Sequence, residues 1–142
     1  IESSMMINDK MPEYCVERAS KILNEDRKPL NGSKILILGV AYKQDIDDYR
    51  ESPAIKVIEI LDRCGSVVDF YDPFVQEYSH KGEKRKGLSA ITPEIVQEYD
   101  LVMITTAHTK VDYTMVSSNA QKVFDTKNAM KDVVHRKNII LL

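Results

Sequence analysis

Residues 33–52, SKILILGVAYKQDIDDYRES, decide the fold of this chain, because they read as a strand, a tight turn, a polar loop and the start of a helix. The run KILILGV is short, uninterrupted and apolar, which is typical of a strand buried on both faces in a parallel sheet. Gly39 predicts a sharp turn or a close backbone approach. Pro53 suits the first turn of a helix, with Ser52 as its N-cap.

The polar loop between this strand and this helix carries an aromatic side chain and two cations, namely Tyr42, Lys43 and Arg50. In an open α/β sheet, ligands bind outside the carboxyl ends of the strands, so these side chains lie where a binding site is expected. The loop also carries acids at positions 45, 47, 48 and 51. A solvated, ion-paired loop without a ligand explains the same charges equally well. The residue pattern alone leaves both interpretations open.

The composition bounds the class of protein. A chain of 142 residues fits one domain, and 43% hydrophobic with 30% charged residues is ordinary for a globular protein. A formal net charge of -2 argues against a nucleic-acid partner. No apolar run reaches the length of a membrane span and no leader pattern is visible, so we expect a cytoplasmic protein without a membrane partner. Cys15 and Cys64 fit reduced thiols, although the sequence leaves a bridge between them open.

The rest of the chain alternates helical and strand patterns. Helices are expected over residues 1–24, 53–64, 93–99 and 112–120. Further strands are expected over residues 66–71, 100–106, 122–125 and 138–142. The charged stretch at 76–87 is expected to be an exposed loop. This order predicts an α/β fold, a three-layer, Rossmann-like, doubly wound and mostly parallel sheet with an N-terminal linker helix.

Polar residues also follow the later strands. Asp72 precedes a proline at the end of the second strand, where a turn or cap role and a ligand role are both open. His108 follows the strand at 100–106 and is expected to be a ligand contact or a surface residue, since nothing nearby in sequence offers it an acid–base partner. The first turn contains only Gly39, so the G-x-G-x-x-G dinucleotide fingerprint is missing.

Residues 39–61, GVAYKQDIDDYRESPAIKVIEIL, followed by VVDFYDPFV at 67–75, closely resemble the C-terminal domain of the UDP-glucose/GDP-mannose dehydrogenase family. The recurring pattern in that family is Gly-x-Ala-Tyr/Phe-Lys, Asp-x-Arg-Glu-Ser-Pro, a helix, a strand and Asp-Pro. Its members use NAD to oxidise the C6 alcohol of nucleotide sugars to uronic acids. The resemblance implies that residues 29–142 are a UDP-sugar-binding domain and that residues 1–28 end a central linker and dimerisation helix.

The same resemblance assigns roles to individual residues. Tyr42 and Lys43 would hold the nucleotide-sugar, with the ring beside the base or ribose and the ammonium near the diphosphate. Arg50 would approach NAD across an interdomain cleft. Lys127 stands where the family usually has an arginine, which keeps the charge but loses the bidentate fork. The helix start at Ser52 is also expected to offer backbone N–H groups to an anion.

The family's dinucleotide fingerprint and its Gly-x-Gly-Gly-x-Cys motif do not occur in this sequence, so neither Cys15 nor Cys64 is expected to be catalytic. The chain opens at Ile1 without an initiator methionine. We therefore expect a fragment, inactive alone, of an NAD-dependent UDP-sugar 6-dehydrogenase whose N-terminal NAD-binding and catalytic domains are absent. The full-length protein is expected to form a homodimer through the linker helix.

The linker also suggests a substrate. Asn8, Met11 and Pro12 are similar to the Asn-x-x-Met-Pro linker of the branch that acts on N-acetylated amino sugars. This favours a UDP-N-acetylhexosamine (UDP-GlcNAc or UDP-ManNAc), with UDP-glucose or GDP-mannose as the alternative. Two non-catalytic alternatives are a receiver-like module and a pure dimerisation module. The receiver fold requires paired acids directly at the end of the first strand, and here the acids follow later.

Overall fold

The computed structural model describes residues 2–142, with side chains described from Lys10 onward, so Ile1 and the side chain of Asn8 lie outside the described part. The elements in chain order are α1 (Glu2–Glu25), β1 (Lys34–Leu38), α2 (Pro53–Arg63), β2 (Val67–Tyr71), β3 (Glu77–His80), β4 (Glu83–Lys86), α3 (Pro93–Gln97), β5 (Leu101–Ile104), α4 (Tyr113–Asn119), β6 (Val123–Asp125) and β7 (Ile139–Leu141). None of the described helices is both long and apolar enough to cross a membrane.

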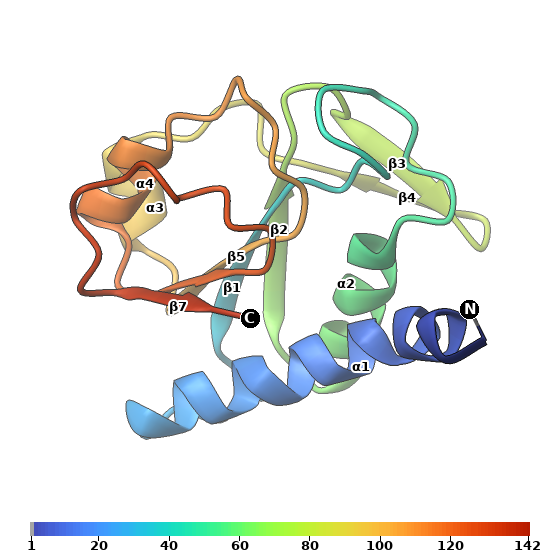
Figure 1. The fold of residues 1–142 in the computed structure, drawn as a ribbon, viewed down its shortest axis with the longest axis horizontal. Helices are drawn as coiled ribbons and strands as arrows, with labels where there is room; N and C mark the ends of the chain where they lie inside the picture. The colour runs from blue at the N-terminus through green and yellow to red at the C-terminus, as the bar shows by residue number, and fades with distance from the viewer. Residues whose placement is uncertain (1) are drawn as a thin grey trace.

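Five strands form one sheet in the order β2-β1-β5-β6-β7, and every neighbouring pair is parallel. Figure 1 shows α1 and α2 on one side of this sheet and α3 and α4 on the other. Alternate residues of β1 separate the two cores: Ile35 and Ile37 pack with α1 and α2, while Leu36 and Leu38 pack with α3 and α4. Burial on both faces is why this strand reads as a continuous apolar run. The predicted three-layer, doubly wound α/β fold is confirmed.

Helix α1 contributes its second half to the core. Five of its side chains are buried against α2 and the sheet, namely Cys15, Val16, Ala19, Ile22 and Leu23. Helix α2 begins at Pro53 with Ser52 as its N-cap, as predicted. It ends just before Gly65, whose φ of +84° is the left-handed conformation that glycine adopts readily. Residues of these two helices form one wall of the cavity described below.

The stretch at 76–87 is a β-hairpin of β3 and β4, so the predicted loop is wrong, although most of its residues are exposed as expected. Its two turn residues, Lys81 and Gly82, have φ of +53° and +81°, as a type I′ turn requires. Tyr78 of β3 is buried, with its ring centroid 5.2 Å from that of Phe70. The prediction failed because the two strands are mostly charged and lack apolar alternation. The Lys-Gly pair was the one local signal of the turn.

Candidate functional site

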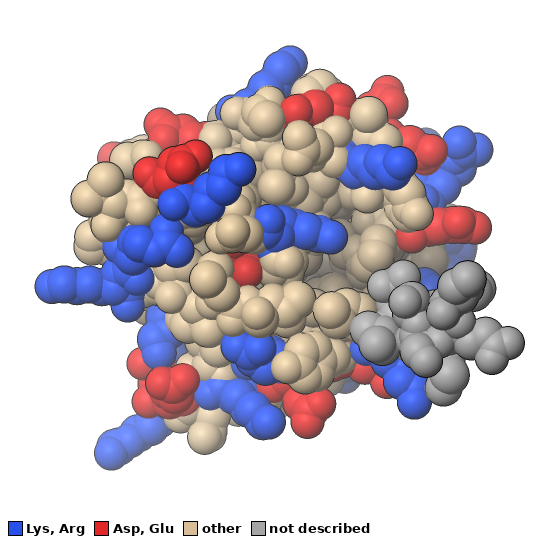
Figure 2. All heavy atoms as spheres, viewed as in Figure 1, with Lys and Arg blue, Asp and Glu red and all other residues tan. Residues whose placement is uncertain are grey.

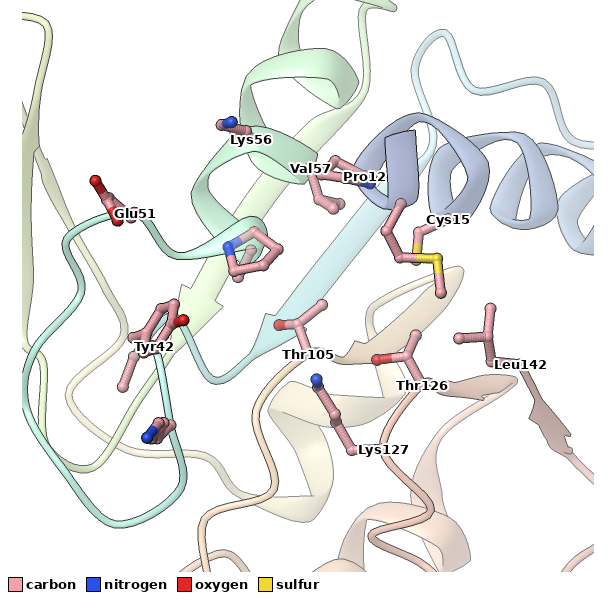
Figure 3. Close-up of a pocket in the computed structure, with 15 residues that line it drawn as sticks. Pro12, Cys15, Tyr42, Glu51, Lys56, Val57, Thr105, Thr126, Lys127 and Leu142 are labelled. Carbon is pink, nitrogen blue, oxygen red and sulfur yellow. The ribbon is translucent and has the colours of Figure 1, made fainter. Parts of the chain in front are cut away.

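A cavity of about 730 Å³ opens at the carboxyl ends of β1, β5, β6 and β7, next to α1 and α2 (Figure 3). Chain order reverses between β1 and β5, which is the switch point where open α/β sheets bind ligands. The volume is in the range of small-molecule sites. The lining residues are Met11, Pro12, Cys15, Ala41, Tyr42, Lys43, Glu51, Pro53, Ala54, Lys56, Val57, Thr105, Thr126, Lys127 and Leu142.

The structure brings together three of the four residues that sequence reasoning assigned to ligand binding. Tyr42 and Lys43 lie on the loop after β1, and Lys127 lies on the turn after β6, yet all three line this cavity. The Lys43 ammonium is 6.0 Å from the centroid of the Tyr42 ring. Figure 3 shows the Lys127 side chain extending towards Thr105. An aromatic ring and two cations therefore converge from distant parts of the sequence.

A third cation, Lys56 of α2, also lines the cavity, and sequence reasoning missed it. The available signal was spacing, because Lys56 lies three residues after Pro53 and so shares its helix face. Among the described lining residues, three lysines face a single acid, Glu51. A local excess of positive charge attracts anions. Figure 2 shows basic and acidic side chains interspersed over the visible face of the molecule.

Arg50 does not line the cavity. Its side chain is 83% exposed and forms a fork with Asp48, with Nε 3.0 Å from Oδ1 and a terminal nitrogen 3.1 Å from Oδ2. The Arg50 guanidinium lowers the pKa of the Asp48 carboxyl by these hydrogen bonds. The ion-paired interpretation of the loop thus holds for this pair, while Tyr42 and Lys43 face the cavity.

The loop after β1 is held by Asp72, whose side chain is fully buried. Its Oδ2 accepts the backbone N–H groups of Val40 at 2.8 Å and Ala41 at 3.0 Å. Its Oδ1 accepts the N–H of Phe74 at 2.8 Å. Burial by itself would raise the pKa of Asp72, but the hydrogen bonds from His108, Phe74 and Val40 outweigh it and lower the pKa. Asp72 is therefore a structural anchor, which resolves the two roles left open for it.

His108 is neither a ligand contact nor a surface residue, so that expectation is wrong. Its side chain is fully buried, and Nε2 lies 2.8 Å from Oδ2 of Asp72. The acidic partner comes from the end of β2, 36 residues earlier, which is why no local pattern revealed it. Nδ1 accepts the backbone N–H of Asp45 at 2.8 Å. His108 thus stabilises the loop after β1 by accepting a hydrogen bond from its backbone.

The turn that carries Lys127 has a matching anchor, the buried carboxylate of Asp125. Its Oδ1 accepts the backbone N–H groups of Lys127 and Ala129, each at 3.1 Å, and its Oδ2 accepts that of Met130 at 2.9 Å. The loop after β1 and the turn after β6 are therefore each held by backbone hydrogen bonds to an aspartate at a strand end. Such anchoring limits the conformational entropy lost when a ligand binds.

The start of α2 does not supply the expected backbone anion site. Pro53 has no N–H, the N–H of Ala54 donates to Oγ of Ser52 at 3.2 Å, and that of Ile55 donates to the Ser52 carbonyl at 3.2 Å. These donors are already used, so the prediction of exposed backbone N–H groups at Ser52 is wrong. Charge recognition in this cavity falls to the lysine side chains.

Cys15 and Cys64 are both free thiols, the first buried and the second exposed. Burial raises the pKa of the Cys15 thiol, although Lys127 and Arg18 oppose this. A raised pKa disfavours the thiolate that a nucleophile requires. Cys15 therefore contributes an apolar wall to the cavity. Within residues 2–142, no described group of His, Cys, Asp and Glu side chains is arranged to hold a metal ion.

A doubly wound parallel sheet with a lysine-lined cavity at its switch point defines an α/β domain of the nucleotide-binding type. Residues 36–132 match the sequence model of the UDP binding domain of the UDP-glucose/GDP-mannose dehydrogenase family. The chain belongs to this family and comprises its UDP-binding domain. The receiver-like alternative is thereby wrong.

Named relatives agree with this membership. The UDP-N-acetyl-D-mannosamine dehydrogenase of Methanocaldococcus jannaschii is 31% identical over 138 residues, covering 92% of this chain and 30% of the relative. The UDP-glucose 6-dehydrogenase of Rickettsia bellii is 31% identical over 140 residues, covering 92% and 31%. The structure of the UDP-D-ManNAc dehydrogenase from Pyrococcus horikoshii matches with a TM-score of 0.75 at 27% identity, covering 96% of this chain and 31% of that one. The chain thus spans about 30% of the length of the relatives it matches.

Proposed function

We propose that this chain is the UDP-sugar-binding part of an NAD-dependent UDP-sugar 6-dehydrogenase, which oxidises the C6 alcohol of a UDP-N-acetylhexosamine to a uronate for polysaccharide precursors. The observation that carries the proposal is the convergence of Tyr42, Lys43 and Lys127 on one cavity at the switch point of the sheet. The family's own description as a UDP-binding domain supports it.

The chemistry of the cavity suits a nucleoside diphosphate. The diphosphate would lie among the ammonium groups of Lys43, Lys56 and Lys127, where charge-assisted hydrogen bonds are stronger than neutral ones. Tyr42 is 50% exposed, which leaves its ring face available to a base or ribose. Because Lys127 is a point charge without a planar fork, we expect it to contribute charge and little geometric selectivity.

The sugar is proposed from the relatives. The Methanocaldococcus jannaschii and Pyrococcus horikoshii proteins are both named for UDP-N-acetylmannosamine, which supports an amino-sugar substrate. The Rickettsia bellii relative, named for UDP-glucose, keeps that sugar as the alternative. Assays of the full-length parent with NAD decide between them. A higher kcat/KM for UDP-N-acetylhexosamines supports the first choice, and a higher value for UDP-glucose overturns it.

NAD is expected to be held mainly outside this chain. The one glycine of the first turn, Gly39, packs against Thr106, because an added Cβ would lie 2.4 Å from the Thr106 Cβ. That glycine therefore serves strand packing and forms no pyrophosphate cradle. Arg50 is the proposed contact to NAD from this domain, which fits its exposed position away from the cavity. We further propose that the chain alone is inactive, and that the cytoplasmic parent is a homodimer joined through α1.

Replacing either Lys43 or Lys127 by alanine should abolish measurable UDP binding. The isolated chain is expected to bind UDP with a dissociation constant on the order of millimolar, because about half of the contacts lie elsewhere. Calorimetric titration of Lys43→Ala and Lys127→Ala should give no heat above dilution. Lys21→Ala is the matched control, since Lys21 is exposed on α1 away from the cavity-lining residues. Equal binding by all three variants, or equal affinity for UDP and GDP, would count against the site.

Arg50→Ala should leave UDP binding by this chain unchanged within about twofold, because an exposed ion pair contributes little and Arg50 does not line the cavity. In the full-length parent, the same change should raise KM for NAD more than KM for the UDP-sugar. A selective rise in KM for the UDP-sugar would contradict the assignment of Arg50 to the cofactor.

A further inference from the structure

One buried pair, Asp72 and His108, ties down both ends of the binding loop (residues 40–45). At the start of the loop, Asp72 accepts the N–H groups of Val40 and Ala41 at 2.8 and 3.0 Å. At its end, His108 accepts the backbone N–H of residue 45 at 2.8 Å. The two ties are joined by the 2.8 Å contact between His108 Nε2 and Asp72 Oδ2.

The hydrogen bonds define the protonation state of His108. A backbone amide only donates, so the nitrogen that accepts from Asp45, Nδ1, carries a lone pair. The ring proton therefore sits on Nε2 and is donated to the Asp72 carboxylate. The lowered pKa of Asp72 is consistent with an ionised acceptor. His108 is thus a neutral imidazole with both nitrogens in use.

Between these two sets of hydrogen bonds lie Tyr42 and Lys43, whose side chains line the cavity. The loop is also held by the N–H of Tyr42, which donates to the Asp48 carbonyl at 2.7 Å, and by the Thr106 hydroxyl, which donates to the Ala41 carbonyl at 2.7 Å. We propose that His108 is a positioning residue for nucleotide binding: its neutral ring presents Tyr42 and Lys43 to the cavity, and its protonation releases the loop. This inference rests on the proposed function, because it predicts a change in nucleotide affinity.

The surroundings of the ring show why a second proton is disruptive. Four titratable or charged groups face or adjoin the His108 ring, namely Asp72, Asp45, Lys110 and Tyr113. The Phe74 ring lies 5.0 Å from the His108 ring between centroids, and the Lys110 ammonium is 4.7 Å from the centroid of the Phe74 ring. The Tyr113 hydroxyl donates to the His108 carbonyl at 2.8 Å.

A proton on Nδ1 would point at the N–H of Asp45 and turn a hydrogen bond into a repulsion. The Asp45 carboxylate, whose Oδ1 is 3.8 Å from Nδ1, then becomes the better partner. Reaching it requires Asp45 to give up part of its hold on Thr109, whose N–H and hydroxyl bond that carboxylate at 2.8 and 3.0 Å. Protonation therefore exchanges one loop arrangement for another.

Two variants that do not titrate separate the hydrogen bond from Asp45 to His108 from the hydrogen bond between His108 and Asp72. In His108→Asn, the amide oxygen stands near the position of Nδ1 and keeps the acceptor for Asp45. In His108→Gln, the amide nitrogen reaches the position of Nε2 and keeps the donor to Asp72. The probe is UDP-N-acetylglucosamine, because its diphosphate diester holds a constant charge over the range in which imidazoles titrate, about pH 5 to 8. Affinity is measured by NMR titration, and thermal melting confirms that each variant is folded.

The wild-type chain should bind at least about fivefold more weakly at pH 5.5 than at pH 8, the size expected for losing one buried hydrogen bond. His108→Asn should bind within about threefold of wild type at pH 8 and lose the pH dependence. His108→Gln should be about fivefold weaker already at pH 8. Controls are His80→Gln and His135→Gln, which should keep the wild-type profile. The same acid weakening in His108→Asn would overturn the proposal while leaving the nucleotide site intact.

A ligand-free measurement keeps the two proposals separate. If the wild-type chain binds no UDP-N-acetylglucosamine at pH 8, it is the proposed function of the isolated domain that fails. The positioning role is then decided by ¹⁵N spectra of the imidazole and by exchange of the Asp45 amide. We expect an Nε2–H tautomer at pH 8 and a protected Asp45 amide that loses protection in acid, except in His108→Asn. An Nδ1–H tautomer or a charged ring at pH 8 would overturn the inference.

Discussion

Replacing Gly39 by alanine is expected to lower the free energy of unfolding by about 3 kcal/mol or more. The added Cβ would lie 2.4 Å from the Cβ of Thr106, 2.6 Å from its carbonyl oxygen and 2.8 Å from its nitrogen. Two of these atoms are backbone, so the contact cannot be relieved by turning a side chain. Gly39 also has φ of +92°, a conformation that alanine adopts at a cost. Urea unfolding followed by circular dichroism measures the difference.

Gly32→Ala is the matched control, because it isolates the backbone cost. Gly32 has φ of +85°, and nothing lies within 4 Å of the position that an added Cβ would take. It should lose about 1 kcal/mol, the penalty of a left-handed alanine alone. If Gly39→Ala and Gly32→Ala are equally destabilised, the close approach of β1 to the segment after β5 does not contribute. The position of the binding loop would then need another explanation.

Asp72→Asn should lower the free energy of unfolding by about 3 kcal/mol. The carboxylate accepts four backbone N–H groups and one imidazole N–H in a buried site. An amide of the same size offers one acceptor oxygen and turns its NH₂ group towards donors. Asp132→Asn is the control, since Asp132 is exposed, and it should change the unfolding free energy by less than about 0.5 kcal/mol. A loss below about 1 kcal/mol in Asp72→Asn would contradict the anchoring role.

The pH dependence of the free energy of unfolding, compared between wild type and Asp72→Asn, provides a second test. The pKa of Asp72 is lower in the folded than in the unfolded chain, so its contribution to stability is complete above the unfolded value, about 3.9. That contribution is lost as the pH falls through the folded pKa. The stability difference between wild type and Asp72→Asn should therefore shrink below about pH 4, as the Asp72 carboxylate becomes protonated. A difference that grows in acid would reverse the sign of the proposed linkage.

The arrangement of the sheet could be predicted from sequence because each strand carries its own local signal. A short apolar run such as 34–38, followed by Gly39 and a capped helix, allows few other structures. The hairpin at 76–87 escaped prediction because its strands are stabilised by tertiary contacts, such as Tyr78 against Phe70, and by ion pairs. Arg85 of β4, for example, lies 2.6 Å from Asp62 of α2. Charged strands of this kind resemble a loop in sequence.

The candidate site was predictable in part for a similar reason. Tyr42, Lys43 and Lys127 follow strand ends, and parallel strands bring such positions to one edge. Lys56 was missed because its place on the first turn of α2 matters only once α2 lies beside the cavity. The Asp72–His108 pair joins two strand ends 36 residues apart, which no local pattern reports.

The most direct test of the nucleotide site is a titration of the ¹⁵N-labelled chain with UDP, followed through its backbone amide resonances. We predict progressive shifts at Tyr42, Lys43, Thr105 and Lys127, on three of the segments that line the cavity, with little change in the β3–β4 hairpin. GDP at the same concentration should produce smaller shifts. Shifts confined to the hairpin, or none at millimolar UDP, would contradict the assignment of nucleotide binding to this cavity.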